Sequence, residues 1–232
     1  MARDRTGPYG AYVPKRRIFL TATAALATLA PGPAVAAPYP RPRSAHESLT
    51  VLLDGNLRYA QGRSRHPHQG RGVRQVLAAA QQPFAVVVGC IDSRVPPELV
   101  FDQGLGDLLC IRTAGEVLDD AVLGSVQFGV AELGVPLVLV LGHERCGAVA
   151  AALAHVAVGA PAPGHLRRLV DSIAPAARAC RDLPGDWAEH TVRRHARAVR
   201  DTLRADPVIG GGGTVVAAAR FDLDSGGVAL LS

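Results

Sequence analysis

Two short motifs in the sequence combine side chains that bind a borderline-soft metal ion. The first, C-I-D-S-R, contains Cys90, Asp92 and Arg94, and the second, H-E-R-C, contains His143 and Cys146. Two thiolates and one imidazole form a ligand set that Zn²⁺ prefers. Three protein ligands leave a fourth position open, which is typical of a catalytic zinc site. The motifs therefore predict a zinc centre with an Asp and an Arg beside it.

Each motif begins where an apolar run of the sequence ends. Runs without polar alternation cover residues 84–90, 108–115 and 136–143. Such runs are typical of parallel strands that are buried on both faces. Helical patterns follow the second and third runs, at residues 119–134 and 146–156. This order predicts an α/β fold with a central, mostly parallel β-sheet that is flanked by helices.

The remaining segments complete the predicted fold and place the motifs within it. We expect helices over residues 47–62, 73–82 and 190–204, and a last core strand over 213–223 that turns back into a C-terminal edge strand over 224–231. In such sheets, ligands bind at the carboxyl ends of the strands. Cys90 and His143 both stand at such ends, so we expect the two motifs to meet in one crevice.

Two other interpretations of the motif residues are open at this point. In a non-catalytic zinc protein the metal only stabilises the fold, but such a site normally has four protein ligands. In a cysteine hydrolase, Cys146 would be the nucleophile and His143 its base, but no third residue that would orient the histidine is evident. Asp92 and Arg94 favour catalysis, because a structural zinc site needs neither.

The N-terminus has the features of an export signal. Arg16 and Arg17 precede an apolar run that ends in the small-residue triplet A-V-A at residues 34–36, which is typical of a cleavage site. The paired arginines resemble a twin-arginine signal. We therefore predict an extracytoplasmic protein with three segments: an export signal over 1–36, a Pro-rich linker over 37–46 and a zinc-dependent catalytic domain over 47–232.

The distribution of charge argues against a nucleic-acid partner. The chain carries a net charge of +5, but residues 1–36 hold five basic residues against Asp4, which leaves only +1 for the rest. That remainder has no basic stripe interleaved with aromatic residues. Pro31 and Pro33 break the apolar run of the signal, so we also expect no stable membrane span.

The motifs C-I-D-S-R-V and H-E-R-C-G resemble those of the β-carbonic anhydrase family. The similarity extends to the segment between them, to G-N-L-R-Y-A-Q-G near the N-terminus and to A-R-F-D-L-D-S-G-G near the C-terminus, and it covers residues 47–232. It implies a β-carbonic anhydrase-like fold and one Zn²⁺ per subunit. The implied activity is the reversible hydration of CO₂ to bicarbonate and a proton by zinc-bound hydroxide. A hydrolase of COS or CS₂ on the same scaffold is the alternative.

The resemblance also implies roles for the motif residues. Cys90, His143 and Cys146 would bind zinc. Asp92, held away from the metal by Arg94, would accept a hydrogen bond from the zinc-bound water. In a closed state, Asp92 would instead bind the metal as a fourth ligand.

Four further positions would contact the substrate, according to the same resemblance. Gln81 and the Gly147 amide would hold bicarbonate, and Leu109 and Phe128 would line the CO₂ pocket. These apolar side chains would be supplied across the interface of a homodimer or a dimer of dimers.

Some residues depart from the family pattern or have no assigned role. Thr113 and Glu116 stand where the family commonly has Asn. We interpret Glu116 as a solvated surface charge, with proton transfer as the alternative. Cys110 is expected to be a buried core residue, although an oxidising compartment would permit a disulfide between Cys110 and Cys180.

Overall fold

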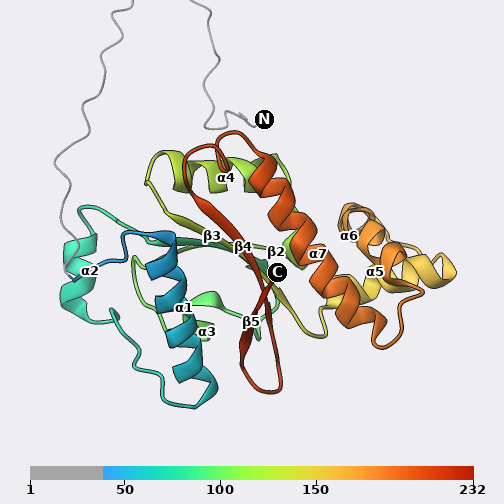
Figure 1. The fold of residues 1–232 in the computed structure, drawn as a ribbon, viewed down its shortest axis with the longest axis horizontal. Coiled ribbons are helices and arrows are strands. Elements are labelled where there is room, and N and C mark those ends of the chain that lie inside the picture. The colour runs from blue at the N-terminus through green and yellow to red at the C-terminus, as the bar shows by residue number, and fades with distance from the viewer. Residues whose placement is uncertain (1–38) are drawn as a thin grey trace, which may run out of the picture. The chain divides into compact units, whose positions relative to one another are not determined.

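A five-stranded sheet in the order β2-β1-β3-β4-β5 forms the centre of the computed structural model, which describes residues 39–232 (Figure 1). Its strands are β1 (Ala85–Cys90), β2 (Leu108–Thr113), β3 (Leu137–His143), β4 (Val215–Phe221) and β5 (Val228–Leu231). All neighbours are parallel except β5, which is antiparallel to β4. The structure thus confirms the predicted, mostly parallel sheet with its C-terminal edge strand. The predicted export signal lies outside the described residues.

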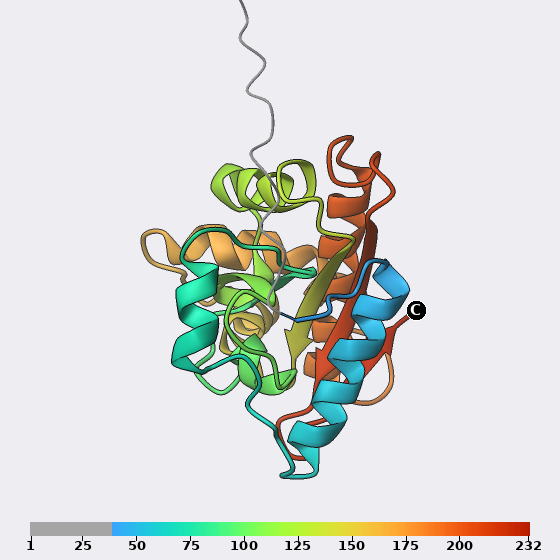
Figure 2. The same cartoon turned by 90° about the vertical axis from the view of Figure 1, so that its left-hand side faces the viewer.

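Helices cover both faces of this sheet (Figures 1 and 2). They are α1 (Ala45–Ala60), α2 (Arg71–Leu77), α3 (Pro97–Val100), the 3₁₀ helix η1 (Ala114–Glu116), α4 (Asp120–Ala131), α5 (Gly147–Val158), α6 (Leu166–Cys180) and α7 (Trp187–Ala205). Of these, α5 and α6 lie beyond the ends of β1 and β3. Among the helices of residues 39–232, none is long and apolar enough to cross a membrane.

Side chains that alternate along β1 bury both faces of the sheet. Val86 and Val88 belong to the core cluster that contains α4 and α7, including Leu203. Val87, between them, belongs to the cluster on the other face, where Leu52 of α1 packs. Successive side chains of a strand point to opposite faces, so an all-apolar strand requires a helical layer on each side. This packing explains why the strand runs have no polar alternation.

Helices α5 and α6 form a third core cluster with α7 beyond the ends of β1 and β3. This cluster contains Cys90 and Cys146 together with Val149 of α5, Ile173 of α6 and Val192 of α7. The two cysteines are therefore packed in an apolar environment, and α5 to α7 supply much of it.

Residues 39–44, which fall in the predicted linker, are attached to the domain. The Tyr39 hydroxyl donates to the Leu105 carbonyl at 2.9 Å. The Arg41 guanidinium donates to the Asp107 carboxylate at 2.7 Å, with only 7% of the Arg41 side chain and 1% of the Asp107 side chain exposed. The Tyr39 ring also stacks on His68, with 3.3 Å between the ring centroids. This segment is therefore part of the folded domain, and the first helix begins directly after it.

Candidate metal centre

The three predicted metal ligands converge in the structure. The ligand atoms of Cys90, His143 and Cys146 all lie within 4.8 Å of one another, and all three residues are buried. Cys90 is the last residue of β1, His143 is the last residue of β3, and Cys146 is the N-cap of α5. Because β1 and β3 are parallel neighbours, their carboxyl ends lie side by side and bring the two motifs together.

The geometry and hydrogen bonding of the set fit a tetrahedral zinc ion. The Cys90 and Cys146 sulfurs are 4.0 Å apart, and zinc–sulfur bonds of about 2.3 Å would place them about 3.8 Å apart. His143 Nδ1 donates to the Glu144 carbonyl at 2.8 Å, so Nε2 carries the lone pair. Nε2 is buried and has no hydrogen-bond partner among the described residues. Such an unpaired buried acceptor is expected of a metal ligand.

The sulfurs of Cys90 and Cys146 form a hydrogen bond with each other. The hydrogen bond between the sulfurs lowers the pKa of Cys90, and the same bond, followed by burial, raises the pKa of Cys146. Cys146 is also the N-cap of α5, and the N-terminal end of a helix favours a thiolate. A divalent cation at this point would compensate the charge of both thiolates.

Asp92 lies beside the ligands but not among them. Its Oδ2 is 3.9 Å from His143 Nε2, while Arg94 donates to Oδ1 at 2.9 Å and to Oδ2 at 2.6 Å. The hydrogen bonds from Arg94 hold the pKa of Asp92 far below its usual range, so the carboxylate is ionised. Within the described residues, only three protein groups therefore converge on the metal position, which corresponds to the open arrangement.

Arg112 holds the chain at the first ligand and two residues after it, and the sequence reasoning did not identify it. Its Nε donates to the Cys90 carbonyl at 2.8 Å, and its Nη2 donates to the Asp92 carbonyl at 2.7 Å. The signal in the sequence was an arginine near the end of the otherwise apolar β2 run. In the sheet, Arg112 pairs with Gly89, which immediately precedes Cys90.

Comparison with known proteins identifies the family. Residues 85–228 match the sequence model of the carbonic anhydrase family. Carbonic anhydrase 2 of Mycobacterium tuberculosis is 42% identical over 181 residues, which cover 76% of this chain and 87% of that protein. The chain belongs to the β-carbonic anhydrase family.

One more curated protein and one solved structure are similar to this chain, the second in its fold. The carbonic anhydrase of Mycolicibacterium smegmatis is 50% identical over 125 residues, which cover 54% of this chain and 61% of that protein. A tetrameric β-carbonic anhydrase of Sordaria macrospora has the same fold, with a TM-score of 0.64 at 23% identity over 80% of this chain and 97% of that one.

Glu116 is not the surface charge that we expected for this family member. Only 3% of the residue is exposed, and its Oε1 has no hydrogen-bond partner among the described residues. Burial, and then the nearby Cys90, raise the pKa of Glu116 well above its usual value. The surface-charge interpretation is wrong because η1 turns the side chain inward, with Gly115 and Glu116 both at positive φ.

The four predicted substrate-contact residues are divided between the metal centre and the surface. Gly147 is the first residue of α5 and directly follows Cys146. Leu109 pairs with Val86, four positions before Cys90, which places it roughly 13 Å back along the sheet. It lines a hollow of about 410 Å³ together with Phe128.

Gln81 lines another surface hollow, of about 550 Å³, with Leu77 and Leu105. Neither this hollow nor that of Leu109 and Phe128 includes a metal ligand or the Asp92–Arg94 pair. A single chain therefore brings only Gly147, of the four predicted substrate-contact residues, beside the metal ligands.

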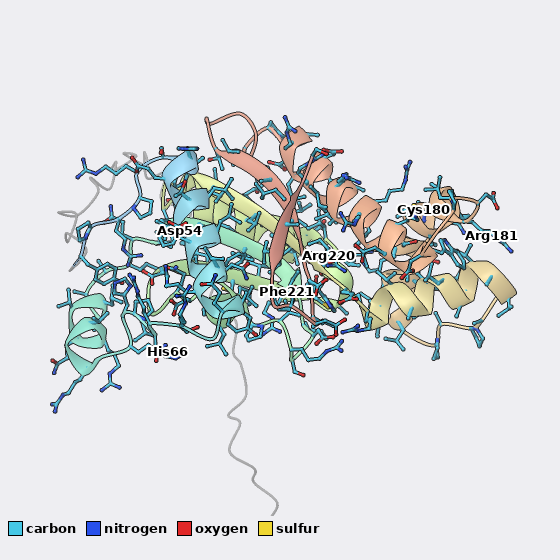
Figure 3. All side chains as sticks on the ribbon, turned by 60° about the horizontal axis from the view of Figure 1, so that its bottom comes forward. Asp54, His66, Cys180, Arg181, Arg220 and Phe221 are labelled. Carbon is cyan, nitrogen blue, oxygen red and sulfur yellow. The ribbon has the colours of Figure 1, made fainter. Side chains whose placement is uncertain are left out.

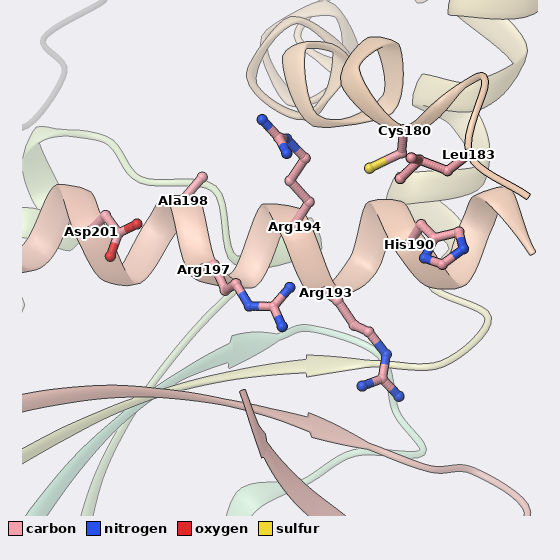
Figure 4. Close-up of a pocket in the computed structure, with 8 residues that line it drawn as sticks. All are labelled: Cys180, Leu183, His190, Arg193, Arg194, Arg197, Ala198 and Asp201. Carbon is pink, nitrogen blue, oxygen red and sulfur yellow. The ribbon is translucent and has the colours of Figure 1, made fainter. Parts of the chain in front are cut away.

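A basic groove along α7 is also separate from the metal centre (Figure 4). It has a volume of about 350 Å³ and is lined by His190, Arg193, Arg194 and Arg197, with Cys180 at the end of α6 and Leu183 in the loop that follows. Arg193 pairs with Glu189 at 2.6 Å, and Arg197 donates to the Ser232 carbonyl at 2.8 Å. Two of the three arginines of this groove therefore already form hydrogen bonds with other groups of the same chain.

The four cysteines of the described residues are free, so no disulfide joins Cys110 and Cys180. Cys110 is only half-buried on β2 rather than fully buried in the core. Cys180 ends α6 next to α7 (Figure 3). Burial raises the pKa of both thiols, so neither is a ready nucleophile.

Proposed function

We propose that this chain is a zinc-dependent carbonic anhydrase that catalyses the reversible hydration of CO₂ to bicarbonate and a proton, with one Zn²⁺ per subunit. The observation that supports this most strongly is the convergence of Cys90, His143 and Cys146 while Arg94 holds Asp92 outside the ligand set. A structural zinc site would have a fourth protein ligand. Bound zinc supplies a hydroxide near neutral pH, because it lowers the pKa of a coordinated water.

The surrounding residues bind and orient the reactants. Ionised Asp92 accepts a hydrogen bond from the nucleophile and orients it toward CO₂. Arg94 keeps Asp92 ionised and away from the ligand position. The Gly147 amide, at the start of α5, donates to the anionic product, because the N-terminus of a helix attracts negative charge.

We further propose that the functional unit is at least a homodimer. Phe128 is 55% exposed and lies in an apolar hollow with Leu109 beside β2, which is an edge strand of the sheet. Exposed apolar patches and open strand edges mark protein interfaces. In the dimer, Leu109, Phe128 and Gln81 of one subunit complete the substrate pocket of the other.

The central experiment is stopped-flow CO₂ hydration across pH on zinc-quantified full-length protein. We expect wild-type activity and a loss of about 100-fold in kcat/KM for Asp92→Asn, because the carboxylate acceptor is removed. COS and CS₂ are offered in parallel, and faster turnover of either one would favour the hydrolase. A folded, zinc-loaded protein without hydration activity at any pH would rule out the proposed function.

The location of the enzyme is a separate proposal. Arg16, Arg17 and the A-V-A triplet at residues 34–36 support export by a twin-arginine signal. Fractionation of cells should find the enzyme outside the cytoplasm, with a new N-terminus after Ala36. Changing both arginines to lysine should retain it inside, and an unprocessed cytoplasmic wild type would refute export without affecting the proposed activity.

A further inference from the structure

A buried histidine on α7 is connected to the metal centre through one intervening residue. His195 is 4% exposed and is not one of the three converging ligands. Its Nε2 lies 2.7 Å from the Gly115 carbonyl oxygen, and the Gly115 amide donates to the Cys90 sulfur at 3.4 Å. Gly115 therefore connects a side chain of α7 to a ligand at the end of β1.

The chemistry of the first contact defines the donor. A carbonyl oxygen can only accept a hydrogen bond, so the proton of the imidazole lies on Nε2 of His195. Burial lowers the pKa of His195, so the ring is neutral around neutral pH. A neutral ring with its proton on Nε2 donates that proton to the Gly115 carbonyl.

The second contact depends on the conformation of Gly115. This residue has a φ of +65°, and an added Cβ would lie 2.7 Å from Ile173 Cδ1 and 2.9 Å from Ala148 Cβ. Only glycine fits this backbone, but glycine is also the residue with the greatest conformational freedom. A fixed carbonyl restricts that freedom, and it thereby keeps the amide of the same residue directed at the sulfur.

We propose that His195 is a positioning residue for the metal centre, because it holds Gly115 so that the Gly115 amide donates to the Cys90 sulfur. This inference rests on the proposed zinc site. Hydrogen bonds to metal ligands orient them and adjust how strongly they donate to the metal, and their loss typically weakens metal affinity 10- to 100-fold. His195 is not one of the three converging metal ligands, so its effect on the metal would be indirect, through Gly115.

Substitutions of His195 that keep or remove a donor at the Nε2 position test the proposal. A Gln side chain places its amide nitrogen near the position of the histidine Nε2, whereas the shorter Asn side chain places its amide near the position of Nδ1. We therefore compare His195→Gln with His195→Asn and His195→Leu. Val199→Ala is the matched control, because it removes buried methyl groups from the same helix without touching Gly115. The readouts are the zinc dissociation constant by chelator competition and the thiolate-to-metal absorption band of the Co²⁺-substituted protein.

Zinc affinity should fall about 10-fold in the Leu and Asn variants and stay within about 2-fold in the Gln and Val199→Ala variants. The thiolate-to-Co²⁺ absorption band should move to longer wavelength only in the Leu and Asn variants, where the Gly115 amide no longer donates to the Cys90 sulfur. A thiolate without that hydrogen bond transfers charge to the metal at lower energy. Wild-type affinity and spectrum in His195→Leu, or equal losses in Val199→Ala, would overturn the proposal.

One measurement needs no variant. In wild-type protein loaded with an NMR-active cadmium isotope, the Gly115 amide proton should show scalar coupling to the metal through the Cys90 sulfur. Absence of that coupling would overturn the inference even if every His195 variant failed to fold. All these readouts measure metal binding rather than turnover, so they stand apart from any failure of the proposed activity.

Discussion

Arg94 donates two parallel hydrogen bonds to Asp92, from Nε to Oδ1 at 2.9 Å and from Nη2 to Oδ2 at 2.6 Å. Arg94 Nη2 also lies 3.4 Å from the Arg145 carbonyl, which links the loop after β1 to the loop after β3. The planar guanidinium thus sets the orientation of the carboxylate relative to both ligand loops.

A lysine cannot reproduce this arrangement, because a single ammonium cannot form two parallel bonds to one carboxylate. We expect Arg94→Lys to keep its zinc and to lose about 10-fold or more in kcat/KM, corresponding to about 1.4 kcal/mol of transition-state stabilisation. Stopped-flow hydration on metal-quantified protein measures this. Arg145→Lys, a neighbouring exposed arginine, should retain activity, and a fully active Arg94→Lys enzyme would contradict the role given to the pair.

Arg112 offers a second test of how the first ligand loop is held. Removing its two hydrogen bonds to the Cys90 and Asp92 carbonyls should allow that loop to move. We therefore expect Arg112→Gln to weaken zinc affinity by about 10-fold and to lower activity, as measured by chelator competition and stopped-flow hydration. Arg181→Gln changes an exposed arginine at the end of α6 and serves as the control (Figure 3). Equal zinc affinity in both variants would show that the loop holds its position unaided.

The sheet and the metal ligands were predictable because their signals are local. An apolar run such as residues 84–90 has few alternatives to a buried strand, and Cys90 and His143 stand where such strands end. Parallel pairing then places the two ligands together, whatever the length of chain between them.

Other features depend on contacts that no local pattern reveals. Helix α6 was not predicted, because several of its buried positions are alanines and Pro175 lies within it. Glu116 was misassigned because only the left-handed turn of η1 directs it inward. His195 stands in a helix that was predicted correctly, but its contact with Gly115 spans 80 positions of sequence.

The edge of the sheet at β2 should be tested as a subunit interface. Phe128→Glu places a charge in the apolar hollow beside Leu109, so it should convert the oligomer to a monomer and lower activity. Light scattering after size-exclusion chromatography measures the mass. Val158→Glu is the control, because Val158 is 81% exposed at the end of α5 and lies outside that hollow. A monomeric wild type, or an unchanged oligomer in Phe128→Glu, would refute the interface.

Burial of His195 also predicts an acid dependence of stability. The pKa of His195 is lowered in the folded state, mainly by burial, from the value of 6.5 that describes an unfolded chain. As the pH falls below 6.5, the unfolded chain takes up the proton first, so the free energy of unfolding decreases until the lower folded pKa is reached. Above pH 6.5 this contribution is fully present.

Urea denaturation between pH 5 and pH 8 in a zinc-buffered solution measures the effect. His195→Gln cannot titrate in that range, so its stability should fall less steeply with acidification than that of the wild type. Parallel stability curves for the two proteins would mean that the His195 ring takes up its proton equally in the folded and unfolded states.

The segment before α1 gives the last prediction. Asp107 is 1% exposed, and it accepts hydrogen bonds from Arg41 at 2.7 Å and from His68 Nδ1 at 2.7 Å. Burial and then Asp107 raise the pKa of Tyr39 to about 12, so its hydroxyl stays protonated; the Tyr39 oxygen accepts a hydrogen bond from Arg41 at 2.8 Å and lies 3.2 Å from the same carboxylate. This network joins the Pro-rich segment to the strand β2 that follows Asp107.

Without the Arg41 guanidinium, the buried Asp107 carboxylate loses one of its hydrogen-bonded partners and its negative charge is less well compensated. Arg41→Ala should therefore lower the free energy of unfolding by about 2–3 kcal/mol. Arg43→Ala, two residues further on at an exposed position, should change it by less than about 0.5 kcal/mol. Urea denaturation compares the two.

A chain that begins at residue 37, as cleavage after Ala36 would produce, keeps this anchor and should match the full-length protein in stability. A chain that begins at residue 43 should lose as much stability as Arg41→Ala or more, and equal stability of the two shortened chains would show that the anchor contributes nothing.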